Sequence, residues 1–378
     1  MVINVASFGG RTHMLDLARE LSKHGHTVRF YSYVPTKRAV KFGLPKECSY
    51  SYFYLAVPFL FLLKCTNFSR TVQMWFYKCF DFILAYIMKP CDILICQGPM
   101  FLYSIKYAHK KGRIVILERG ISHILEYCEN LKNNPTLKGK PPIRKDFIQR
   151  DLDSFLLADY ISVGANHVKN SFTRYGIPES KVFLNNYGCS LDDFHPTELD
   201  KTTKPFDLLM VGQWCYRKGC DLITEYVKKH QEKSLLHIGS IVDCPFPQLP
   251  NAIHKDAVDE KKLITYYKQA RVFILPSREE GLALVQVQAI TCGLPLVCSK
   301  KSGGEDLKQY VREKDCIVII EDFSIASIEV GVERALAISH KQIGTRSLVD
   351  KEHICSWENY GKRYNEFIQQ IRCHNENC

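Results

Sequence analysis

A short apolar strand that leads through glycine into a helical pattern occurs twice in this chain. The first copy is Val2–Ala6 followed by Gly9 and Gly10, and the second is residues 207–211 followed by Gly212. A strand that passes through glycine into a helix is the usual start of a Rossmann-like α/β unit. Two such starts in 378 residues predict two Rossmann-like domains rather than one large sheet.

Further apolar runs of strand length alternate with helical patterns in both halves. They lie at residues 27–33, 92–96, 113–117, 160–163 and 181–184, and then at 235–238, 272–275, 296–298 and 317–320. Alternating strands and helices predict parallel sheets that are covered by helices on both faces. A polar stretch with two prolines at 196–205 predicts the join. We therefore expect domains over 1–198 and 199–355, with a last amphipathic helix over 356–378.

The 16 cysteines are scattered singly, without a CxxC pair. The chain opens on a strand and a turn, not on the apolar leader of a secreted protein. We therefore expect reduced cysteines that serve as small buried side chains in a cytoplasmic protein. No group of cysteines and histidines has the spacing of zinc ligands, so the sequence predicts no metal site.

The positive charge of the chain is concentrated in its first part. Residues 1–150 hold 23 Lys and Arg against 9 Asp and Glu, whereas the remainder holds 28 against 31. Such a basic domain suits an anionic partner, such as a membrane surface, a lipid diphosphate or an acidic glycan. Solubility alone would also explain the charge, and no nucleic-acid-binding motif accompanies it.

The longest apolar run, YFYLAVPFLFLL at residues 52–63, is too short to span a bilayer and contains Pro58. We expect it to form a buried strand and loop. The alternative is a patch at a membrane interface, since the basic and aromatic residues Lys64, Arg70, Trp75 and Lys78 follow it. Peripheral attachment to the inner face of a membrane therefore stays open.

Two segments of the second half suit a bound diphosphate. In LPSREEGLALVQVQ a strand leads through Glu280 and Gly281 into a helix that we expect to run from Leu282 to Gly293. The free N–H groups at a helix start bind anions. Arg217 and Lys218 lie in the loop after the first strand of the second domain, at the edge of the sheet where ligands bind.

An ordered set of motifs resembles one known family. It comprises the Gly9-Gly10 loop, a helix that ends in HGHTV, the run ADYISVGANHVKNSFTRYGIPESKVFLNNYGCSLDDFHP, then VGQWCYRKG, PSREEGLALVQVQAITCGLPLV and SWENYGKRYNEF. The chain resembles the family 4 retaining glycosyltransferases of GT-B fold over most of its length. The resemblance implies two Rossmann-like domains whose parallel sheets face a central cleft. It also implies that the last helix packs back on the first domain.

The resemblance also implies the residues of a nucleotide-sugar site in the second domain. Arg217 and Lys218 match the diphosphate-binding pair, and Glu280 matches the first acid of a Glu-x7-Glu signature that contacts sugar hydroxyls. The second signature acid, which contacts the ribose, is replaced here by Gln288. The full donor-binding set that the resemblance implies is Gly9, Gly10, Gly212, Arg217, Lys218, Glu280, Gly281, Leu282, Ala283, Leu284 and Gln288.

The implied reaction moves a sugar from a UDP- or GDP-sugar to a hydroxyl of a glycan or lipid-linked saccharide, with retention and without an obligatory metal or other cofactor. His123, Glu280 and Lys218 are the candidate catalytic residues. His123 could instead be structural, and Glu118 could be a buried acid paired with Arg119. Two other functions stay open. One is a non-catalytic glycan-binding subunit, which Gln288 favours. The other is an oxidoreductase, which is disfavoured because neither glycine loop has the dinucleotide-binding pattern GxGxxG.

Overall fold

The strands form two sheets in the computed structural model, which describes residues 1–9, 12–199, 205–350 and 355–376. The strands of the first sheet are β1 (Val2–Ala6), β2 (Thr27–Ser32), β3 (Ser49–Ser51), β4 (Ile93–Gln97), β5 (Ile114–Arg119), β6 (Tyr160–Val163) and β7 (Val182–Leu184). Those of the second are β8 (Phe206–Val211), β9 (Leu235–Ile238), β10 (Ala252–Lys255), β11 (Ala270–Leu275), β12 (Leu296–Ser299) and β13 (Ile317–Ile320). Every pairing between these strands is parallel.

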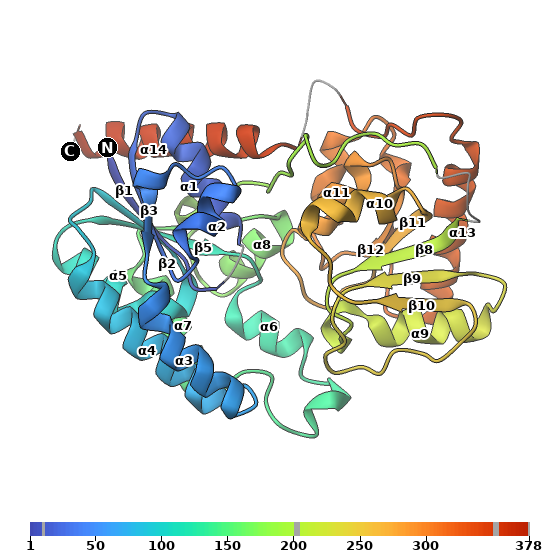
Figure 1. Cartoon of the computed structure of the whole chain (residues 1–378), viewed down its shortest axis with the longest axis horizontal. Helices are drawn as coiled ribbons and strands as arrows, with labels where there is room; N and C mark the ends of the chain where they lie inside the picture. The colour runs from blue at the N-terminus through green and yellow to red at the C-terminus, as the bar shows by residue number, and fades with distance from the viewer. Residues whose placement is uncertain (10–11, 200–204, 351–354, 377–378) are drawn as a thin grey trace.

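The helices surround each sheet (Figure 1). The first lobe carries α1 (His13–Lys23), α2 (Thr36–Lys41), α3 (Phe53–Cys65), α4 (Arg70–Ile87), α5 (Leu102–Lys110), α6 (Ile124–Asn130), α7 (Lys145–Leu157) and α8 (Asn166–Arg174). The second lobe carries α9 (Cys220–Lys229), α10 (Leu263–Tyr267), α11 (Leu284–Thr291), α12 (Gly304–Leu307) and α13 (Ile325–Lys341), and α14 (Trp357–Glu376) follows it. The predicted architecture of two Rossmann-like parallel α/β units is confirmed.

Strand order fixes where each lobe can bind a ligand. The order is β3-β2-β1-β4-β5-β6-β7 in the first sheet and β10-β9-β8-β11-β12-β13 in the second. From β8 the chain winds outward through β9, whereas from β11 it winds the other way through β12. The loops that leave β8 and β11 therefore run in opposite directions at the carboxyl ends of these strands, which is where ligands bind in sheets of this kind. The same reversal occurs between β1 and β4 in the first lobe.

Two strands and one helix differ from what the sequence indicates. Strands β3 and β10 lie at the sheet edges and are only partly buried, so they lack the continuous apolar run of central strands. The apolar run at residues 52–63 is not a buried strand and loop. It forms the helix α3, in which only Ala56 and Leu63 are buried, and it has Pro58 inside it. Apolar content alone does not reveal burial.

The two connections between the lobes run side by side. The backbone N–H of Cys189 donates to the carbonyl of Cys355 at 2.9 Å, and Cys189 and Ser356 form a parallel bridge. From there α14 crosses to the first lobe and packs on α1, where a Cβ on Gly361 would lie 2.3 Å from the Cβ of Glu20 (Figure 1). The two helices therefore approach each other through a residue that has no side chain.

We expect Gly361→Val to lower the free energy of unfolding by about 1–3 kcal/mol, because the added side chain overpacks the contact with Glu20. Gln370→Val places the same β-branched residue at an exposed position of α14 and serves as the control. Denaturant unfolding of both variants measures the difference. Equal stability of the two variants would show that α14 does not press on α1 at Gly361.

Candidate active site

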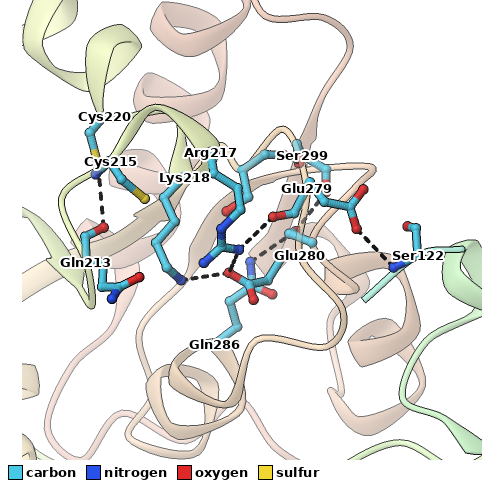
Figure 2. A network of polar contacts seen from close by, with 12 residues as sticks. Ser122, Gln213, Cys215, Arg217, Lys218, Cys220, Glu279, Glu280, Gln286 and Ser299 are labelled. Atoms are coloured by element: carbon cyan, nitrogen blue, oxygen red, sulfur yellow. Dashed lines mark hydrogen bonds and ion pairs between the residues drawn. The ribbon is translucent and has the colours of Figure 1, made fainter. Parts of the chain in front are cut away.

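Three charged side chains meet where β8 and β11 end. Arg217 and Lys218 belong to a 3-10 turn, η5 (Tyr216–Lys218), that follows β8, and Glu280 belongs to the loop that follows β11. One carboxylate oxygen of Glu280 accepts from Arg217 Nη1 at 2.9 Å and from Lys218 Nζ at 2.7 Å (Figure 2). The reversal of strand order between β8 and β11 thus brings together residues that are 62 and 63 positions apart.

The charge of this cluster is held at low exposure. Lys218 is 8 % exposed, and the side chain of Glu280 is 17 % exposed. Burial by itself raises the pKa of Glu280, but the charges of Lys218 and Arg217 outweigh it and lower that pKa to about 2. For Arg217, burial lowers the pKa, but the negative groups around it, Glu280 foremost, together outweigh burial and raise the pKa. Two fixed cations and one anion leave a net positive site at neutral pH.

Contacts of Arg278 hold the loop that carries the two cations in place. The guanidinium of Arg278 donates to both carboxylate oxygens of Asp221 at 2.6 and 2.7 Å and lies 3.8 Å from the ring centre of Tyr216. The backbone N–H of Arg278 also donates to the carbonyl of Arg217 at 2.8 Å. Planar stacking and bidentate bonding fix an arginine more tightly than a single ion pair would. Arg217 and Lys218 are therefore presented by a rigid turn.

Two glycines permit close approach of backbone at the site. Gly219 has a φ of 73°, and a Cβ there would lie 2.2 Å from the carbonyl oxygen of Pro276, so only glycine lets the two loops meet. The other glycine is the predicted donor-binding residue Gly281. A Cβ there would lie 2.1 Å from the carbonyl oxygen of Gly120 in the first lobe. Gly212, also predicted, lies beneath the Lys218 side chain.

Polar bonds join the two lobes beside this cluster. Glu279 is fully buried, points away from Glu280, and accepts from the backbone N–H of Ser122 at 3.0 Å and from the side-chain amide of Asn130 (Figure 2). Burial raises the pKa of Glu279. The ring of His167 lies 2.9 Å from the backbone carbonyl oxygen of Glu280. Of the two adjacent acids, one joins the lobes and the other contacts the cations.

The helix after Glu280 begins two residues later than expected, at Leu284. Its N-cap is Ala283, which makes no side-chain capping bond, so the first-turn N–H groups of α11 are not capped by a side chain. Leu282 and Ala283 are buried. Gln288 is 4 % exposed. It accepts from the hydroxyl of Tyr267 and donates to Glu260 Oε1, both at 3.1 Å.

His123, a predicted catalytic residue, lies in a packed aromatic cluster. It is 3 % exposed, and its ring stacks on Tyr175 at 4.6 Å and contacts Phe155 and Phe172. Its Nδ1 accepts from the backbone N–H of Leu125 as the N-cap of α6. Burial, with Arg119 nearby, lowers the pKa of His123 to about 4. These contacts pack the ring and cap α6, and a catalytic role for His123 stays a prediction.

A different histidine has a carboxylate partner. Nε2 of His13 lies 3.0 Å from Oε2 of Glu118, the next-to-last residue of β5, and the His13 ring lies against Tyr187. Glu118 is therefore not paired with Arg119, which instead forms an ion pair with Asp151 at 2.6 Å. The sequence gives no reason to single out His13, because its partner lies 105 residues away. Only its position directly after the glycine loop could have drawn attention to it.

That glycine loop follows β1, at the strand reversal of the first lobe. Gly9 has a φ of 128°, in the region that favours glycine. Gly10, the other predicted glycine, lies outside the described residues. Within the described parts of the chain, no three His, Cys, Asp or Glu side chains gather closely enough to hold a metal ion.

Comparison with known proteins identifies the family of this chain. Residues 205–337, which contain the whole Arg217–Lys218–Glu280 cluster, match the family described as "Glycosyl transferases group 1". An "Uncharacterized glycosyltransferase" of Haemophilus influenzae is 33% identical over 376 residues and aligns with 95% of each chain. The chain belongs to the group 1 glycosyltransferases. A glycogen synthase of Thermus thermophilus is 26% identical over 177 residues, which cover 44% of this glycosyltransferase and 39% of the synthase.

Solved structures share the GT-B fold with this glycosyltransferase. Sucrose-phosphate synthase from Thermosynechococcus elongatus superposes with a TM-score of 0.63 at 14% identity and covers 99% of both chains. An Anabaena protein solved with UDP and glucose superposes with a TM-score of 0.62 at 9% identity, over 98% of this chain and 100% of the other. At such low identity the likeness shows the fold alone.

The ion pairs of Glu280 should make the stability of this glycosyltransferase depend on pH. Since its folded pKa of about 2 lies below the ordinary value of 4.5, its stabilisation is full above pH 4.5 and is lost as the pH falls toward 2. We expect the free energy of unfolding of wild type to exceed that of Glu280→Gln by about 3 kcal/mol at pH 7. This difference should shrink as the pH falls from 4.5 toward 2. Denaturant unfolding at several pH values measures the difference.

Glu225→Gln is the control for this experiment, because Glu225 is exposed and belongs to the same lobe. Its stability should follow that of wild type at every pH. A gap between wild type and Glu280→Gln that persists unchanged down to pH 2 would contradict the ion pairs.

Proposed function

We propose that this glycosyltransferase moves a sugar from a nucleoside-diphosphate sugar to a hydroxyl of a saccharide acceptor, with retention of configuration and without a metal ion. The observation that carries the proposal is the single oxygen of Glu280 that both Arg217 and Lys218 contact. A point at which two rigidly held cations converge on one anionic oxygen suits a phosphate oxygen equally well. The donor diphosphate would bind there.

The electrostatics of the cluster match the demand of the reaction. When the bond between the anomeric carbon and the phosphate oxygen breaks, negative charge grows on the departing diphosphate. Arg217, Lys218 and the N–H groups at the start of α11 would stabilise that charge without a metal ion. Retention follows if the acceptor hydroxyl attacks from the face that the diphosphate leaves, with a phosphate oxygen taking the hydroxyl proton.

Glu280 and Gln288 are assigned to the rest of the donor. Glu280 would turn from the cations to the hydroxyls of the transferred sugar once the diphosphate binds. Gln288 replaces an expected acid, but its amide donates to the carboxylate of Glu260. A carboxylate therefore still lies beside this position. The amide and the carboxylate together would bind the ribose hydroxyls.

The comparisons support a nucleotide-linked donor and a saccharide acceptor of unspecified kind. One structural neighbour holds UDP and glucose, and the catalytic domain of a starch synthase from Arabidopsis thaliana, with a TM-score of 0.58, holds ADP and acarbose. We assign a UDP- or GDP-sugar as donor and a glycan or lipid-linked saccharide as acceptor. Thermal stabilisation of the protein by a panel of nucleoside diphosphates tests the base that it prefers.

Lys218→Ala and Arg217→Ala should each lower kcat/KM for sugar transfer by about 100- to 1000-fold, because each removes a charge that stabilises the leaving diphosphate. Transfer is measured with the donor that the thermal-shift panel selects. Lys300→Ala removes an exposed lysine of the same lobe and should keep the wild-type rate. Near-normal rates in both site variants would refute the assigned diphosphate site.

A second test separates packing from chemistry at His123. His123→Phe keeps an aromatic ring among Phe155, Phe172 and Tyr175, and it loses the capping bond to Leu125, at a cost of about 1 kcal/mol. We expect kcat to stay within about threefold of wild type. A general acid or base would lose about 100-fold or more. The rate constant at saturating donor and acceptor distinguishes the two results.

A further inference from the structure

The helices α3, α4 and α5 expose many more large apolar side chains than the rest of the surface. Half of the exposed large apolar residues of the described chain lie between Tyr54 and Tyr107. On α3, Tyr54 is 88 % exposed and Phe61 is 69 % exposed. Isolated exposed apolar residues are ordinary, whereas a contiguous group indicates an interaction surface.

On α4 and α5 the exposed rings are contiguous. Trp75, Phe82 and Tyr86 follow one another at helical spacing along the outer side of α4, with exposed fractions of 67, 52 and 67 %. Phe82 meets Tyr103 of α5 at 5.8 Å between ring centres, and Tyr86 meets Tyr107 at 6.0 Å. The two helices therefore share one aromatic surface.

The turn between α3 and α4 adds one more exposed ring. Phe68 has a φ of 55° and is 69 % exposed, and its backbone N–H donates to the carbonyl of Leu63 at 2.8 Å. A bulky residue rarely adopts a left-handed backbone conformation. Phe68 adopts this unfavourable conformation with its ring exposed, in the turn at the end of the α3–α4 hairpin (Figure 1).

No acidic side chain is exposed on these three helices. Neither α3 nor α5 contains an acidic residue, and the one acid of α4, Asp81, is fully buried in an ion pair with Arg150. Exposed cations flank the rings: Lys64 and Arg70 at the hairpin turn, and Lys106 and Lys110 on α5. The surface formed by α3, α4 and α5 is thus aromatic and positive, and is called the aromatic face below.

We propose that the aromatic face binds the surface of a membrane that contains anionic lipids. Aromatic side chains favour the boundary between head groups and acyl chains, and lysines beside them attract anionic head groups. A second copy of the chain suits this face poorly, since two positive surfaces would repel each other. The face lies on the membrane and does not cross it, because no described helix is long and apolar enough to span a bilayer.

Trp75 reports directly on this contact. The chain has three tryptophans, of which Trp214 is 0 % and Trp357 is 5 % exposed, so a change in fluorescence on adding vesicles comes from Trp75. We expect its emission to shift to shorter wavelength with phosphatidylglycerol vesicles at low salt. Phosphatidylcholine vesicles should give a much smaller shift. Absence of any shift or sedimentation with the anionic vesicles would overturn the proposal.

Matched variants separate the face from general charge and apolarity. Lys106→Glu with Lys110→Glu, and separately Phe82→Ser with Tyr86→Ser, should each weaken binding to anionic vesicles by about tenfold or more. The controls are Lys228→Glu with Lys314→Glu, and Val330→Ser, which change exposed residues of the second lobe. Equal effects of face and control variants would overturn the proposal.

Two further readouts keep the result independent of catalysis and folding. Far-ultraviolet circular dichroism and thermal unfolding show whether the exposed substitutions leave the fold intact, as expected. Sedimentation velocity without lipid tests self-association. A dimer that the Phe82→Ser and Tyr86→Ser variant abolishes, together with no vesicle binding by wild type, would assign the face to a second copy. Neither result depends on the donor site, so failure of the proposed transfer reaction would leave this inference standing.

Discussion

The pairing of one partly buried carboxylate with two cations joins two central loops of the second lobe. Arg217 and Lys218 come from the loop after β8, and Glu280 comes from the loop after β11, so their ion pairs join the two elements at which the strand order reverses. The charges of this cluster outweigh the desolvation of Glu280 and keep it ionised at low exposure. Such a cluster links the two loops, and an anionic oxygen of a ligand could take the place of the Glu280 oxygen between the two cations.

Much of the fold could be predicted because central parallel strands are buried on both faces and read as continuous apolar runs. That signal is lost at the sheet edges, where β3 and β10 are short and half exposed. An apolar run also misleads at α3, because it does not tell whether its side chains pack inside the protein or lie on its surface. The helix leaves most of its apolar side chains outside the core.

Some contacts of the candidate site could be predicted from the sequence, and others could not. Arg217, Lys218 and Glu280 could be predicted to converge, since each follows a strand of one sheet at its carboxyl edge. The pairing of His13 with Glu118 and the packing of His123 depend on contacts across the sheet and between helices. No local spacing encodes such contacts. A histidine near a strand end is therefore a weak signal until its neighbours are known.

The lobes are joined in two different ways, and the difference bears on how a donor could enter. Beside the cluster the contacts are polar, such as Glu279 to the Ser122 backbone and His167 to the Glu280 carbonyl. Such bonds can be exchanged for bonds to water at small net cost. At the other junction, α14 packs tightly on α1 through Gly361. Opening of the lobes at the cluster would break these polar contacts, whereas α14 would keep the second lobe tethered to the first.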